Sequence, residues 1–121
     1  MLKKRVLIID DDTRNIFALK ATLQSKGFEC RSCLSALEAL TILKTEEVID
    51  VILIDMMMPD MDGYEAIPRI KNLDNRRETP IFSVTAQAMV GDREKCLRAG
   101  ATDYIAKPID VDRLLHLLST I

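Results

Sequence analysis

The sequence lacks any apolar run long enough to cross a membrane. Its two apolar runs, Val6–Ile9 and Val51–Ile54, fall far short of the ~20 residues that a spanning helix needs. Basic residues precede the first run, as in a secretory signal, but the apolar part is much shorter than the core of such a signal. We therefore expect a soluble, cytoplasmic protein that makes no membrane contact.

Cysteine and histidine are also scarce. Three cysteines, an odd number without framework spacing, indicate reduced thiols rather than disulfides. Cys30 and Cys33 form a CxxC pair inside a predicted strand, where this spacing sends the side chains to opposite faces, so we expect neither a zinc site nor a redox site. The only histidine, His116, lies among leucines and is interpreted as an ordinary helix residue.

Neither sign of charge dominates, since 17 basic and 19 acidic residues give a formal net charge of -2. The chain shows no local basic patch, which argues against nucleic acid as a partner. The sequence contains no repeat, linker or low-complexity tract. Its 121 residues, 48% hydrophobic and 30% charged, predict one compact domain over 1–121.

What the chain does have is a regular alternation of strand-like and helix-like stretches. The predicted strands are 5–10, 28–33, 50–55, 79–85 and 102–106, and the predicted helices are 13–26, 35–45, 63–73, 90–99 and 111–119. Helical spacing predicts three core faces, formed by Ile16, Leu19 and Leu23, by Leu37, Leu40 and Leu43, and by Val111, Leu114, Leu115 and Leu118. Gly27 and Gly100 are placed to end the first and fourth helices. Pro68 lies inside the third predicted helix, which should kink there or begin later.

This alternation predicts an α/β fold with a parallel sheet covered on both faces. Burial on both faces explains the unbroken apolar runs VLII and VILI. In such doubly wound folds the ligand site lies beyond the carboxyl ends of the strands. The residues at those ends are therefore the candidates for function.

Acidic residues gather at these strand ends. Asp10, Asp11 and Asp12 follow the first strand, and Asp55 ends the third. An acidic turn alone is commonly a solvated loop that caps the next helix. Converging carboxylates, however, repel one another unless a cation joins them. Oxygen ligands with room for water favour Mg²⁺, and Mn²⁺ could take its place.

A lysine and a threonine complete the set of strand-end groups. Lys107 follows the fifth strand, and its ammonium group would repel a metal ion unless an anion lay between them. A phosphoryl group is the natural anion. Asp55 would then be the nucleophile, while Lys107 neutralises phosphoryl oxygens and Thr85, at the end of the fourth strand, offers its hydroxyl. A cis bond between Lys107 and Pro108 would fix where the lysine points.

Four motifs, IIDDD, IDMMMPDMDGYE, SVTAQA and AGATDYIAKPID, occur in an order and spacing that resembles the receiver domain of bacterial two-component response regulators. The stretch AMVGDREKCLRAGATDYIAKPIDVDRLL is most similar to receivers of hybrid sensor histidine kinases. The resemblance implies a flavodoxin-like (βα)5 fold with strand order 2-1-3-4-5. Met1 and the lack of a second domain fit a stand-alone receiver or a piece of a longer chain.

The resemblance also implies a role for each matching residue. Asp55 would accept a phosphoryl group from the phosphohistidine of a histidine kinase or phosphotransfer domain. Asp10, Asp11, Asp55 and the backbone carbonyl of Met57 would hold Mg²⁺. Asp12, outside this set, is expected to cap the first helix or tune the charge of the site. Lys107, expected to precede a cis proline, matches the lysine of the family, and Thr85 and Tyr104 match its switch pair.

The same resemblance implies a signalling module and not an enzyme, beyond its own phosphorylation and slow dephosphorylation. Output would pass to a downstream protein through the fourth helix, fifth strand and fifth helix, in a monomer or a weak phosphorylation-dependent dimer. The chain departs from the family at Met57 and Gln87, where polar groups often govern hydrolysis of the acyl phosphate. We therefore predict slow self-dephosphorylation, because a thioether does not orient water as an amide or acid does.

Three alternatives share parts of this pattern. An aspartyl-phosphate phosphatase usually has a second acid two residues after the nucleophile, where this chain has Met57. A flavodoxin-like mononucleotide binder needs a phosphate loop after the first strand, and DDDTRN is acidic. An interaction module without phosphorylation would have no chemical need for Asp11, Asp55, Thr85 and Lys107 together.

Overall fold

Strands and helices alternate along the whole chain, as the sequence predicts. The computed structural model describes residues 3–86 and 91–121. Over these ranges the elements are β1 (Arg5–Ile9), α1 (Thr13–Ser25), β2 (Glu29–Cys33), α2 (Ala36–Leu43), β3 (Val51–Asp55), α3 (Gly63–Lys71), β4 (Ile81–Thr85), α4 (Asp92–Ala99), β5 (Asp103–Ala106) and α5 (Val111–Leu118). Val90 and Gln87, both named in the sequence predictions, lie outside the described residues.

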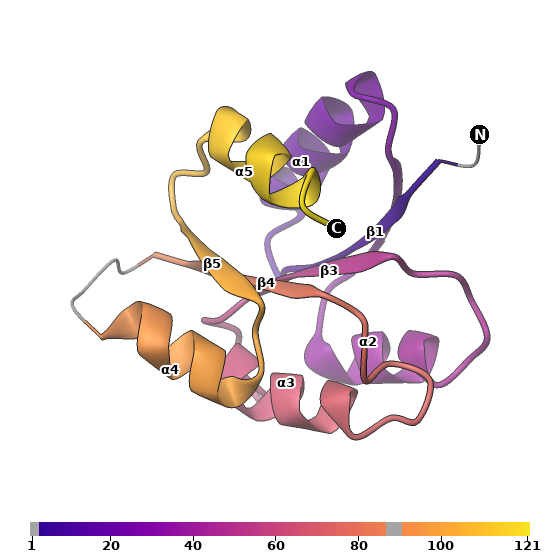
Figure 1. Cartoon of the computed structure of the whole chain (residues 1–121), viewed down its shortest axis with the longest axis vertical. Helices are drawn as coiled ribbons and strands as arrows, with labels where there is room; N and C mark the ends of the chain where they lie inside the picture. The colour runs from indigo at the N-terminus through magenta and orange to yellow at the C-terminus, as the bar shows by residue number, and fades with distance from the viewer. Residues whose placement is uncertain (1–2, 87–90) are drawn as a thin grey trace.

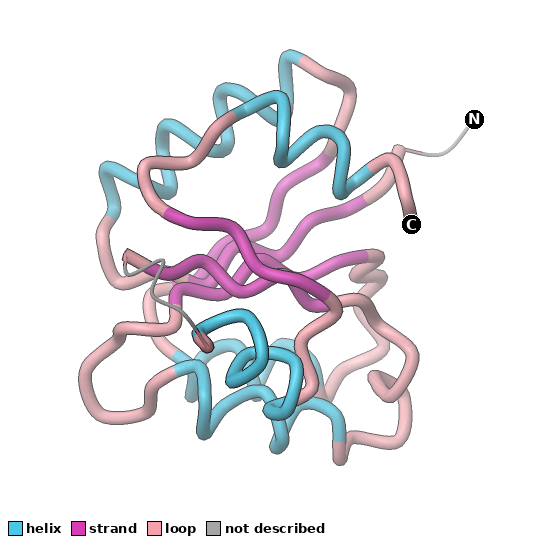
Figure 2. Tube along the Cα trace, turned by 60° about the vertical axis from the view of Figure 1, so that its left-hand side comes forward, coloured by secondary structure: helices cyan, strands magenta, loops and turns pink. Residues whose placement is uncertain are grey.

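All neighbouring strands pair in parallel, in the order β2-β1-β3-β4-β5. This order confirms the predicted doubly wound fold. Helices α1 and α5 lie over one face of the sheet, and α2, α3 and α4 lie over the other (Figure 1). Figure 2 shows the resulting three layers, with the strands between two layers of helices. The strand order reverses between β1 and β3, where such folds place their ligands.

The sheet divides the hydrophobic core into two clusters. One lies against α1 and α5 and includes Val6, Ile8, Leu53 and Phe82, and the other lies against α2, α3 and α4 and includes Leu7, Ile9, Ile52 and Ile54. Successive residues of one strand thus enter opposite clusters, as side chains on a pleated strand must. Cys33 belongs to the second cluster and Cys30 packs against the first, which confirms that this CxxC pair is split by the sheet.

Two predicted core residues are exposed. Leu37 is 61% exposed because the buried stripe of α2 is made by Ala36, Ala39, Leu40 and Leu43, which leaves Leu37 pointing away from the sheet. Val111 is 39% exposed at the first position of α5, before the helix reaches the core. Both predictions were wrong. For Leu37, helical spacing alone does not tell which of two overlapping stripes faces the sheet, and for Val111 it does not tell that the first position of the helix lies outside the core.

Pro68 does not displace the start of α3, which begins at Gly63 and runs through the proline. Proline removes one backbone hydrogen bond, to the carbonyl of Tyr64. Pro68 lies on the exposed side of the helix. Water can reach the carbonyl from that side and replace the missing donor. The described helices include none that is long and apolar enough to cross a membrane.

A buried arginine fixes the connections at the amino-terminal ends of the strands. Arg76 is only 5% exposed, and its guanidinium donates to the carbonyls of Leu43, Thr45 and Glu47 at 2.9, 3.0 and 2.7 Å. The Leu43 carbonyl belongs to the last residue of α2, where the helix dipole places negative partial charge, and the other two carbonyls lie in the connection that follows. The guanidinium therefore joins the α3–β4 connection to the α2–β3 connection.

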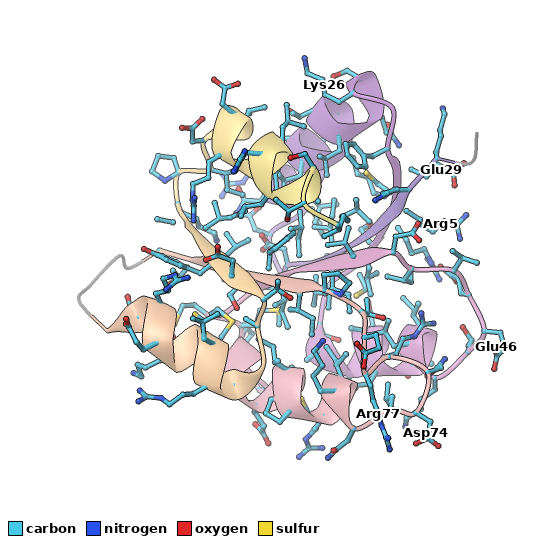
Figure 3. The ribbon with its side chains drawn as sticks, in the orientation of Figure 1. Arg5, Lys26, Glu29, Glu46, Asp74 and Arg77 are labelled. Carbon is cyan, nitrogen blue, oxygen red and sulfur yellow. The ribbon has the colours of Figure 1, made fainter. Side chains whose placement is uncertain are left out.

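Charged side chains surround this end of the sheet. Figure 3 labels Arg5, Glu29, Glu46, Asp74 and Arg77, which gather on the right, at the side where the strands begin. Arg5 lies 3.6 Å from carboxylate oxygens of Glu29 and of Glu47. The opposite end, where the strands finish, has a different chemistry.

Candidate phosphoryl and metal site

Three carboxylates meet beyond the carboxyl ends of β1 and β3. Asp10 and Asp55 are each 4% exposed, whereas Asp11 is exposed. One oxygen atom from each of Asp10, Asp11 and Asp55 lies within 4.8 Å of the others. The sequence therefore predicted correctly that these acids come together. A set of carboxylate oxygens this close suits a hard divalent ion such as Mg²⁺.

Burial and charge repulsion both disfavour the ionised form of Asp10 in this arrangement. Burial raises the pKa of the Asp10 carboxyl above its ordinary value, and the nearby Asp55 carboxylate adds to the rise. The backbone N–H of Asp12, which donates to Oδ1 of Asp10 at 2.9 Å, opposes the rise, as does Lys107. Repulsion between Asp10 and Asp55 is the electrostatic condition that a bound cation would relieve.

Lys107 brings a positive charge beside the carboxylate of Asp55. Its Nζ lies 3.3 Å from Oδ2 of Asp55. The Lys107–Pro108 bond is cis, as predicted, and the backbone N–H of Lys107 donates to the carbonyl of Thr85 at 2.8 Å. These contacts place the lysine beside Asp55. Lys107 directly follows β5, a strand that does not pair with β3.

The second oxygen of Asp55 faces the loop that follows β3. Oδ1 accepts a hydrogen bond from the backbone N–H of Met57 at 3.0 Å. The Met57 side chain is 60% exposed, whereas Met56, Met58 and Met61 are exposed by 0%, 7% and 9%. Met57 is thus the one methionine of the described loop that faces solvent, directly beside Asp55.

Thr85 and Tyr104 lie on neighbouring strands. Thr85 ends β4 and is 3% exposed, and it pairs with Ala106 of β5. Tyr104 pairs with Ser83 and is partly buried against the cluster under α2, α3 and α4. The strand register therefore puts Tyr104 two positions further from the site edge than the residue that pairs with Thr85.

Sequence reasoning missed Asn15, which lies in the first turns of α1. Its Nδ2 is 3.5 Å from Oδ2 of Asp10. The sequence feature that could have indicated Asn15 is its position, five residues after Asp10, which puts it on the face of α1 turned toward the end of β1. Asn15 also lines a cleft of about 270 Å³ between α1 and the β5–α5 connection, with Asp10, Lys107 and Pro108.

Asp12 has the capping role expected for it. It is the N-cap of α1, and its Oδ1 accepts from the backbone N–H of Arg14 at 2.9 Å. The Arg14 side chain donates to the same carboxylate, and these bonds lower the pKa of Asp12. His116 is exposed on α5, as expected of an ordinary helix residue.

The fold and this edge define a class of doubly wound α/β domains with an acidic strand-end site and a lysine beside it. The family model of the response regulator receiver domain matches residues 6–119, so the chain belongs to that family of two-component signalling domains.

Relatives of two kinds share this domain. The chain is 41% identical over 117 residues to the signal transduction histidine-protein kinase BarA of Shigella flexneri, covering 97% of this chain and 13% of that protein. It is 33% identical over 119 residues to the polar-differentiation response regulator DivK of Brucella anthropi, covering 98% of this chain and 96% of DivK. The chain thus spans a small part of the kinase relatives and nearly all of DivK.

Solved structures agree with the fold. The receiver domain of sensor histidine kinase PA1611 from Pseudomonas aeruginosa PAO1 superimposes with a TM-score of 0.88 at 34% identity, covering 98% of this chain and 97% of that one. That structure has a magnesium ion coordinated in its active site cleft. The chemotaxis protein CheY4 of Vibrio cholerae superimposes with a TM-score of 0.91 at 28% identity, covering 99% of each chain.

Proposed function

We propose that Asp55 accepts a phosphoryl group from a phosphohistidine of a histidine kinase or phosphotransfer domain. An oxygen of Asp55 would attack phosphorus in line as the bond between phosphorus and the imidazole nitrogen breaks. The electron pair of that bond stays on the imidazole, which then takes a proton from solvent. The contact between Lys107 Nζ and Asp55 Oδ2, beside two further acids, is the observation that carries the proposal.

Asp10, Asp11, Asp55 and the backbone carbonyl of Met57 would hold Mg²⁺. When bound, the ion supplies positive charge that offsets the charge of the transferring phosphoryl oxygens. Lys107 neutralises charge on the same group, and Thr85 offers a hydroxyl hydrogen bond. The proximity of the three carboxylates and the rise in the pKa of Asp10 support this ligand set.

Phosphorylation would then shift the chain between two conformations that already coexist, with Thr85 turning toward the phosphoryl group and Tyr104 moving inward behind it. The output surface would be α4, β5 and α5, in a monomer or a weak phosphorylation-dependent dimer. We assign residues 1–121 to one receiver domain, with no enzymatic turnover of another substrate. Its free cysteines suit a reducing cytoplasm.

The rival is an interaction module that keeps the fold but is never phosphorylated. Intact-mass spectrometry after incubation with acetyl phosphate separates the two, with and without Mg²⁺, on the parent chain and on Asp55→Asn. We expect a Mg²⁺-dependent, base-labile gain of one phosphoryl group that Asp55→Asn abolishes. If acetyl phosphate fails, a phosphohistidine donor is tried, and no gain from either donor would favour the unphosphorylated module.

A further inference from the structure

Met57 combines two properties that no other described methionine shares. Its side chain is 60% exposed, and its backbone N–H is bonded to the proposed phosphoacceptor, Asp55. Met56, Met58 and Met61 belong to the same loop but pack into the core cluster under α2, α3 and α4. An oxidant in solution therefore reaches the Met57 thioether far more readily than these neighbours.

We propose that Met57 is a redox modification site, whose oxidation by peroxide shortens the lifetime of the phosphorylated Asp55. The thioether sulfur attacks one peroxide oxygen, the O–O bond breaks, and the products are methionine sulfoxide and water. Sulfur loses two electrons and the peroxide gains them, so the step is balanced without another reactant. This inference rests on the proposed phosphorylation of Asp55.

Oxidation adds a polar oxygen to the Met57 side chain, beside the proposed phosphoacceptor. A thioether is a weak acceptor, whereas a sulfoxide oxygen is strongly polar and accepts hydrogen bonds from water. Water held beside Asp55 by such an acceptor keeps a lone pair free to attack phosphorus. We expect hydrolysis of the acyl phosphate to accelerate about fivefold, the rate equivalent of one net hydrogen bond.

Substitutions at two methionines isolate the effect. Met57→Leu keeps an apolar side chain of similar size and leaves the backbone N–H and carbonyl in place, but it cannot be oxidised. Met58→Leu is the matched control, because Met58 is in the same loop and is buried. Met57→Asn supplies a permanent polar group at the same position and should shorten the lifetime without peroxide.

The experiment treats the parent chain and each variant with dilute hydrogen peroxide and reduces thiols afterwards with dithiothreitol. Peptide mass spectrometry gives the extent of oxidation at each methionine. Each sample is then phosphorylated with acetyl phosphate and Mg²⁺, freed of donor, and followed by intact mass to obtain the half-life. Methionine sulfoxide reductases treat a portion of the oxidised parent to restore the thioether.

We expect Met57 to oxidise ahead of Met56, Met58 and Met61, and the half-life to fall about fivefold in the parent and in Met58→Leu but not in Met57→Leu. Reductase should restore the original half-life. Slow oxidation of Met57, or an unchanged half-life once Met57 is oxidised, would overturn the inference. Failure of the unoxidised parent to gain a phosphoryl group would instead count against the proposed function, and peptide mapping would still test the oxidation.

Discussion

Nζ of Lys107 lies 3.3 Å from Oδ2 of Asp55, although 52 positions separate the two residues in the chain. Asp55 ends β3 and Lys107 follows β5, and β4 lies between these strands in the sheet. The lysine therefore reaches across the end of β4. If Asp55 carries a phosphoryl group, as proposed, the ammonium has a more highly charged oxygen within reach and can transfer its hydrogen bond there.

Lys107→Met should slow phosphorylation of Asp55 by about tenfold or more, because it removes a positive charge that stabilises the transferring group. The rate of mass gain from acetyl phosphate measures the effect. Lys44→Met is the control, because Lys44 is exposed at the end of α2, next to the Leu43 carbonyl that Arg76 contacts at the opposite end of the strands from the site. Equal rates in the two variants would remove Lys107 from the mechanism.

Asp12→Ala should lower the free energy of unfolding by about 1 kcal/mol, the usual effect of losing an N-cap. The rate of phosphorylation should stay as in the parent chain, because Asp12 caps α1 and lies outside the proposed ligand set. Urea unfolding and intact mass give the two values. Asp11→Ala should show the reverse pattern, and a loss of phosphorylation in Asp12→Ala would mean that Asp12 belongs to the metal site.

Arg76→Lys should destabilise the fold by about 2–3 kcal/mol, because one ammonium group cannot satisfy three carbonyls that a planar guanidinium reaches. The neighbouring Arg77→Lys serves as the control, since the Arg77 side chain is 67% exposed and pairs with Asp74 on the surface. Its effect should stay within about 0.5 kcal/mol. Urea unfolding compares the two, and equal losses would contradict a structural role for the buried guanidinium.

Alkaline pH should destabilise the parent chain through Cys33. Burial raises the pKa of this thiol from 9.0 to about 11. The unfolded thiol ionises first, so the stability linked to this group is complete below pH 9.0 and disappears as the pH rises through about 11. Its upper limit is about 3 kcal/mol.

Cys33→Ala tests this linkage, because alanine does not ionise. Urea unfolding of both chains, measured from neutral pH to about pH 11, should show a smaller loss of stability in the variant. The variant will also be less stable at neutral pH, since it loses buried side-chain volume, so the comparison is between slopes. Parallel curves would show that Cys33 does not contribute to the alkaline loss.

The sequence predicted the parallel sheet, and also that Asp10, Asp11, Asp55 and Lys107 would meet. Parallel strands all finish at one edge, so strand-end residues converge wherever the strand order allows it. The resemblance of the motifs to the receiver family further predicted the strand order and the cis bond before Pro108, and the structure confirms both. The meeting of side chains at strand ends can therefore be predicted from short motifs.

Other features depend on tertiary packing. Leu37 fits a helical stripe as well as Leu40 does, and only the placement of α2 on the sheet decides that Leu40 is buried. Arg76 lies in a polar stretch, NLDNRRE, where nothing distinguishes it from Arg77. Its burial depends on carbonyls that lie 29 to 33 positions earlier in the chain.

The guanidinium of Arg76 and the acids of the site lie at opposite ends of the strands. Substitutions where the strands finish can therefore change the chemistry of the site, while the contacts of Arg76 where the strands begin keep the protein folded. A library confined to exposed positions of the connections after β1, β3 and β4, with the N-cap Asp12 kept, would test new phosphoryl donors, phosphorylation lifetimes and metals for the proposed site while the contacts of Arg76 stay unchanged. A library at the other end would mainly change how much protein a cell accumulates.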